Sequence, residues 1–78
     1  MVETYTINFR FRGRYIHGYV QAFQDSCLVN ITDQEILSDF TGVFTFRLPE
    51  KKFVPGFQRN KDVKDLPELV GGIQDQLH

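Results

Sequence analysis

Apolar and polar side chains alternate through residues 5–20, on both sides of an Arg12-Gly13 pair. A period of two residues is typical of a β-strand, and a short glycine-containing pair between two such runs predicts a tight hairpin. With Arg12 and Gly13 as the two loop residues, Phe9 lies opposite Ile16. A slip of one residue would mix apolar with polar positions, so the pattern specifies this register strongly.

The predicted hairpin has one apolar face and one polar face. The apolar face holds the pairs Tyr5–Val20, Ile7–Gly18, Phe9–Ile16 and Phe11–Arg14, and the polar face holds Thr4–Gln21, Thr6–Tyr19, Asn8–His17 and Arg10–Tyr15. Because alternate residues of a strand point to opposite sides of a sheet, we expect the first face to enter the core and the second to meet solvent.

Two further strands are predicted downstream of the hairpin. Residues 27–32 alternate again, and residues 43–48 are rich in β-branched and aromatic side chains before Pro49 ends the run. Between these two strands, Thr32 or Asp33 is placed to cap a single helical turn. The four strands are expected at about 3–12, 14–23, 27–32 and 43–48.

Residues 49–64 form the longest segment without periodicity, and they contain two of the three prolines. A Pro55-Gly56 pair inside the segment is a turn signal. Phe53, Val54 and Phe57 either pin an irregular loop against the sheet or belong to a short fifth strand, and the pattern leaves both alternatives open. Since no period is sustained, we expect an irregular basic loop over 49–64. Loops of this length are usually mobile or functional.

The C-terminal residues predict a helix over about 65–77. Asp65 is placed as N-cap, and Glu68 three residues later completes a capping-box pattern. Gly71 and Gly72 each cost about 1 kcal/mol relative to alanine, so the helix depends on tertiary packing, where the glycines permit close approach to the sheet. The apolar positions at helical spacing are Leu66, Leu69, Val70, Ile73 and Leu77.

These elements predict an α+β fold, a four-stranded antiparallel β-meander with one C-terminal α-helix packed across one face. At 78 residues the chain is expected to form a single domain, 1–78, with one thin core and no deep cleft. Eight phenylalanines, three tyrosines and no tryptophan mean that large rings supply much of the core volume.

Composition narrows the class of protein further. A single cysteine, Cys27, excludes an intramolecular disulfide framework and a multi-thiolate zinc site. The sequence shows neither a secretory signal nor an apolar run long enough to span a membrane, so we expect a cytoplasmic protein with no membrane association. Bases exceed acids in residues 1–24 and 51–64, and acids exceed bases elsewhere, which favours internal charge complementarity or an anionic partner.

Candidate chemistry is sparse, and we expect a non-enzymatic protein without cofactor, catalytic site or metal site. Cys27 and His17 are a conceivable thiolate and base, but the strand pattern around Cys27 predicts a buried, inert thiol. The two histidines are far apart in sequence, and Asp33, Glu35 and Asp39 lack the spacing of a calcium loop.

Two surfaces mix cations with aromatic rings, the combination that holds phosphates and stacks bases in single-stranded nucleic acid. One is the polar face of the hairpin, and the other is the basic loop, where the cations surround Phe53 and Phe57. A solvated sheet face and a solvated linker are the plainer interpretations. The candidate binding residues are Arg10, Arg12, Tyr15, His17, Tyr19, Lys51, Lys52, Arg59 and Lys61.

The pattern F-x-F-x-G-x-x-I-x-G-x-V, from Phe9 to Val20, precedes two further strands and an amphipathic helix. In this arrangement the chain resembles short uncharacterised bacterial proteins of meander-plus-helix type. The resemblance implies the fold and carries no activity.

Three functions follow as hypotheses. The first is association with a protein partner or with a second copy, for instance as a homodimer paired through sheet edges. The alternative is weak binding of single-stranded nucleic acid through the Arg/Tyr face and the basic loop. A small enzyme that uses Cys27 or His17 is the remote third option.

Overall fold

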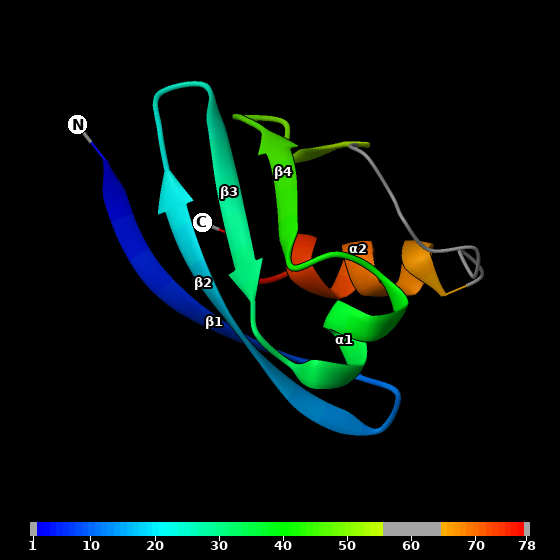
Figure 1. The fold of residues 1–78 in the computed structure, drawn as a ribbon. Coiled ribbons are helices and arrows are strands. Elements are labelled where there is room, and N and C mark those ends of the chain that lie inside the picture. Colours follow the sequence, from blue (N-terminus) through cyan, green and yellow to red (C-terminus); the bar gives the residue numbers. More distant parts are fainter. Residues whose placement is uncertain (1, 56–64, 78) are drawn as a thin grey trace.

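The computed structural model describes residues 2–55 and 65–77. Five strands pair in chain order into one antiparallel sheet, and two helices complete the α+β fold (Figure 1). The elements are β1 Glu3–Phe11, β2 Arg14–Ala22, β3 Ser26–Ile31, α1 Gln34–Asp39, β4 Val43–Arg47, β5 Lys52–Val54 and α2 Leu66–Gln74. The antiparallel sheet and the C-terminal helix confirm the expected architecture.

The predicted number of strands is wrong, because part of the expected basic loop forms β5. Lys52 pairs with Arg47, and Phe53 pairs with Phe46, so the chain turns back on β4 soon after Pro49. The remainder of the expected loop, residues 56–64, lies outside the described residues.

The predicted hairpin register is confirmed at every pair from Glu3–Ala22 to Phe11–Arg14. Arg12 has φ 53° and Gly13 has φ 74°, so both loop residues adopt the left-handed conformation that a two-residue hairpin of this kind requires. Glycine adopts this conformation without steric cost, whereas in Arg12 the Cβ atom makes the same conformation unfavourable.

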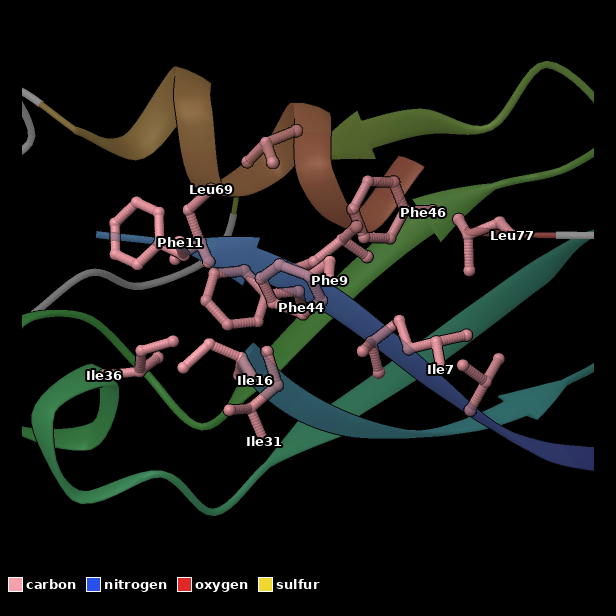
Figure 2. Packing of buried hydrophobic residues seen from close by; sticks show 14 of the residues in the cluster. Ile7, Phe9, Phe11, Ile16, Ile31, Ile36, Phe44, Phe46, Leu69 and Leu77 are labelled. Atoms are coloured by element: carbon pink, nitrogen blue, oxygen red, sulfur yellow. The ribbon is translucent and has the colours of Figure 1, made fainter. Parts of the chain in front are cut away.

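One face of the sheet, the inner face, carries the core (Figure 2). Leu69 of α2 points toward the phenylalanine rings of β1 and β4, and Ile36 of α1 closes the core at the hairpin end. Both helices therefore pack on the same face of the sheet. The fully buried side chains of this core are Phe11, Ile16, Val20, Cys27, Val29, Ile31, Ile36, Phe44, Phe46, Leu69 and Ile73.

The helical turn expected after the third strand is α1, and of the two candidate caps Asp33 is the one used. Its carboxylate accepts a hydrogen bond from the backbone N–H of Ile36 at 3.3 Å, which satisfies one of the free donors at the start of the helix. Ile36 and Phe40 then face the core, with the ring of Phe40 edge-on to that of Phe11.

Helix α2 is shorter than the predicted 65–77, and Asp65 occupies the predicted N-cap position without capping through its side chain. The side chain of Asp65 makes no capping hydrogen bond, because its carboxylate accepts from the guanidinium of Arg12. Beyond Gln74 the chain continues as a turn that still buries Leu77.

The expected close approach of the glycines to the sheet holds for one of them. A Cβ at Gly72 would lie 3.1 Å from a ring carbon of Phe9, whereas a Cβ at Gly71 would meet nothing within 4 Å. At the end of the helix, the Gln74 side-chain amide donates to the carbonyl of Lys51 at 2.8 Å, which ties α2 to the β4–β5 turn.

Candidate binding surface

The second face of the sheet, the outer face, has neither helix packed on it, because both pack on the inner face. The strand registers place its side chains in rows across the five strands. Its members are Thr4, Thr6, Asn8 and Arg10 of β1; Tyr15, His17, Tyr19 and Gln21 of β2; Ser26, Leu28 and Asn30 of β3; Val43, Thr45 and Arg47 of β4; and Lys52 and Val54 of β5.

Three ring-bearing residues follow one another on the outer face of β2. Tyr15, His17 and Tyr19 occupy alternate positions, so neighbouring side chains are about 7 Å apart along the strand. Tyr15 is 69% exposed and Tyr19 is 47% exposed. We call these three residues the ring ladder.

Neighbouring strands supply polar groups on both sides of the ring ladder. Asn8 of β1 lies opposite His17, and Asn30 of β3 lies opposite Tyr19. The guanidinium of Arg10 lies over the Tyr15 ring, 5.4 Å from its centroid, in a cation–π contact. The rings are thus flanked by amides that can both donate and accept hydrogen bonds, and by a cation.

The strand positions of the outer face include no aspartate or glutamate. They do include three basic residues, Arg10, Arg47 and Lys52, and none of these forms an ion pair with a described residue. The outer face is therefore positive although the whole chain has a net charge of −1. A local positive field of this kind attracts anionic ligands.

Four carboxylates lie instead at the tip of the β1–β2 hairpin, where they contact two arginines. Arg12 contacts Glu35 at 2.8 Å, Asp39 at 2.6 Å and Asp65 at 3.0 Å, and it joins the hairpin turn to α1 and to the start of α2. Arg14 binds both carboxylate oxygens of Asp33 and also contacts Glu35. We call these six residues, Arg12, Arg14, Asp33, Glu35, Asp39 and Asp65, the ion-pair cluster.

The ion-pair cluster accounts for part of the charge asymmetry seen in the sequence, because it pairs two bases of residues 1–24 with acids from later in the chain. The hydrogen bonds that Arg12 donates to Asp39 and Glu35 raise the pKa of its guanidinium above the usual value, and the hydrogen bonds that Asp33 accepts from Arg14 lower the pKa of Asp33. Arg12 also lies over the rings of Phe11 and Phe40, at 5.0 and 5.5 Å. The guanidinium of Arg12 therefore makes its contacts within the ion-pair cluster and with these two rings, away from the ring ladder.

At the β4–β5 end, the outer face is hollowed. The hollow has a volume of about 550 Å³ and includes Asp25 of the β2–β3 turn among the residues that line it. Arg47 and Lys52 project at its rim from neighbouring strands. The other lining residues are Ser26, Thr45, Phe53, Val54 and Pro55.

Of the candidate residues named from the sequence, the structure brings Arg10, Tyr15, His17, Tyr19 and Lys52 onto one face. Arg12 lies in the ion-pair cluster, Lys51 is half-buried in the β4–β5 turn, and Arg59 and Lys61 lie outside the described residues. Sequence reasoning did not name Arg47 or Asn30 as binding residues. The sequence does contain a signal for Arg47, because it alternates with Phe44 and Phe46 and therefore lies on the face of the strand opposite to these two rings.

Cys27 and His17 lie on opposite faces of the sheet, so they do not form a thiolate and base pair. Cys27 is 1% exposed, and burial raises the pKa of its thiol, which disfavours the nucleophilic thiolate. Within residues 2–55 and 65–77, no three His, Cys, Asp or Glu side chains are grouped so that they could hold a metal ion. No helix in that part of the chain is long and apolar enough to cross a membrane.

No family model matches the chain, and no curated protein or solved structure is significantly similar to it. The geometry of the outer face is therefore the basis on which a function can be proposed.

Proposed function

We propose that this protein is a non-enzymatic association module that binds another macromolecule through the outer face of its sheet. The observation that carries the proposal is the difference between the inner and the outer face of the sheet. The inner face is covered by α1 and α2, whereas the strand positions of the outer face expose tyrosines among cations and amides and hold no carboxylate; Asp25 of the β2–β3 turn lines the hollow at one end of this face. Exposed rings and arginines with few acids are typical of recognition surfaces.

The charge of the outer face selects among partners. Two copies stacked through their outer faces would place Arg10, Arg47 and Lys52 of one copy near those of the other, and like charges repel. An acidic surface or segment of a different protein would instead complement the cations, and the ring ladder would supply contact area. The first form of the proposal is therefore association with an acidic protein partner.

Self-association through a sheet edge is the second form, and a separate observation favours it. Among the described strands, the nine-residue β1 ends the sheet on one side and pairs with β2 alone. Backbone groups on the far side of such a strand can pair with a strand of a second copy. Light scattering over a range of concentrations tests this form, because a mass that stays monomeric at the highest concentration contradicts it.

The test of the proposed function compares what the protein retains from a lysate of its native host before and after the outer face is altered. A Tyr15→Thr/Tyr19→Thr double variant removes two rings while keeping residues that favour strands. Phe23→Ala is the matched control, because Phe23 is an exposed ring in the β2–β3 turn, outside the ring ladder.

A partner that is retained by the wild type and by Phe23→Ala but lost by the double variant supports the proposal. If the double variant retains the same macromolecules as the wild type, the outer face is a solvated sheet surface and the proposal is wrong. Nuclease treatment of the lysate separates a protein partner, which survives it, from a nucleic acid.

A further inference from the structure

We propose that the ring ladder is a stacking platform for single-stranded nucleic acid, with the cations of the outer face holding the phosphates. This inference depends on the proposed function, since it uses the same outer face, and it names single-stranded nucleic acid in place of an acidic protein as the partner. It stands on three observations, namely the spacing of the rings, the polar groups beside them and the distribution of charge.

The spacing of the ring ladder suits successive bases. Tyr15, His17 and Tyr19 occupy alternate positions on the outer face, so the rise of β2 places their Cα atoms about 7 Å apart. Bases of a single strand can be separated and stacked one by one on such side chains, and because every base has a π-face the contacts tolerate any sequence.

The polar groups beside the rings suit the edges of bases. Asn8 and Asn30 flank the middle and the end of the ring ladder from opposite sides, and Gln21 continues the row along β2. Carboxamides donate and accept at once, so they match the mixed donor and acceptor edges that unpaired bases expose. A duplex hides these edges, and we therefore expect a preference for single strands.

The charges suit a phosphate backbone that crosses the sheet. Arg10 lies at the hairpin end of the ring ladder, while Arg47 and Lys52 lie beside the hollow at the β4–β5 end. The cations lie at both ends of the ring ladder, and the strand positions between them hold no carboxylate. A polyanion therefore meets attraction at both ends, reduced at the hollow by Asp25, which lines it together with Arg47 and Lys52. The ion-pair cluster keeps Asp33, Glu35, Asp39 and Asp65 engaged with Arg12 and Arg14.

The experiment is a fluorescence anisotropy titration of labelled oligothymidine and oligoadenosine, each of about twelve nucleotides, within the range that single sheet-based modules cover. A duplex of the same length and a labelled polyglutamate peptide are run in parallel. Three phosphate contacts predict that affinity falls roughly 15- to 20-fold between 50 and 200 mM salt.

Variants separate stacking from simple charge attraction. Tyr19→Thr is expected to weaken binding to the oligonucleotides by about tenfold, and Tyr19→Phe is expected to restore it, because the ring and not the hydroxyl makes the contact. Phe23→Ala leaves affinity unchanged. Arg10→Gln makes the salt dependence shallower, since one phosphate contact is lost. Circular dichroism confirms that each variant is folded.

Several outcomes overturn the inference. They are no binding at low salt, equal binding of duplex or polyglutamate, and no loss of affinity in Tyr19→Thr. If the oligonucleotides fail while the lysate experiment still shows a nuclease-resistant partner that depends on Tyr15 and Tyr19, the proposed function stands and only the identity of the partner is wrong.

Discussion

Alanine substitution at the two adjacent glycines of α2 tests how that helix meets the sheet. Gly71 and Gly72 both lie inside the helix, so alanine at either position should gain about 1 kcal/mol in helix propensity. The two positions differ only in what the added methyl group meets. At Gly71 it meets nothing within 4 Å, and at Gly72 it lies 3.1 Å from a ring carbon of Phe9.

The magnitude follows from this contact. The ring of Phe9 is buried in the core and cannot move without disturbing its neighbours, and overpacking of this kind typically costs 1–3 kcal/mol. Gly71→Ala should therefore stabilise the protein by about 1 kcal/mol, which raises the melting temperature by roughly 4–8 °C in a domain of this size. Gly72→Ala should range from no net change to a loss of about 2 kcal/mol.

Urea denaturation followed by far-ultraviolet circular dichroism measures both variants against the wild type. The informative quantity is the difference between the two free energies of unfolding, because helix propensity is common to both variants. If Gly72→Ala stabilises the protein as much as Gly71→Ala, α2 does not pack on Phe9 as described and the reasoning is refuted.

Three further predictions concern the ion-pair cluster and the buried thiol. Arg12→Asn keeps a residue that tolerates positive φ but removes the guanidinium. It should lower the urea midpoint and make that midpoint less sensitive to salt than in the wild type. An unchanged midpoint would show that the ion-pair cluster does not contribute to stability. Asp33 has its pKa lowered by Arg14, so its contribution is present above the unfolded pKa and is lost as the pH falls through the folded one. Stability of the wild type should therefore decline below about pH 4, and Asp33→Asn, which preserves a capping side chain, should flatten that decline in acid unfolding curves. Cys27 should resist iodoacetamide until the protein unfolds, and modification of the folded protein, read by mass spectrometry, would contradict its burial.

The hairpin and the C-terminal helix could be predicted from the sequence because each has a strong local pattern. Alternation on both sides of Arg12-Gly13 leaves one register that buries Phe9 and Ile16 together, and every expected pair is observed. Such agreement is expected where one face of a strand pair is apolar, since a slipped register would expose it.

The fifth strand could not be predicted, because three residues are too few to show a period. Lys52–Val54 forms a strand since Arg47 and Phe46 of β4 already offer an edge, and that edge exists only in the folded sheet. Tertiary context therefore decides the structure here.

The role of Asp65 shows a second limit of local reasoning. Its position before an apolar helix pattern predicts an N-cap, yet Arg12, 53 residues earlier in the chain, takes its carboxylate. The same contact removes Arg12 from the expected binding face. Long-range ion pairs leave no periodic signal in a sequence, so Arg12 was predicted to share a binding face with Arg10. In the structure, the guanidinium of Arg10 lies over Tyr15, whereas that of Arg12 pairs with Asp65.

Nuclear magnetic resonance gives the most direct test of the central claim that the outer face of the sheet binds single-stranded nucleic acid. Amide chemical shifts of the wild type are followed while unlabelled single-stranded oligothymidine is added at low salt. The account predicts that the shifts change along Tyr15, His17 and Tyr19 and at the facing residues Asn8 and Asn30. Changes confined to α1 and the ion-pair cluster, or a spectrum that stays the same at saturating oligonucleotide, would contradict it.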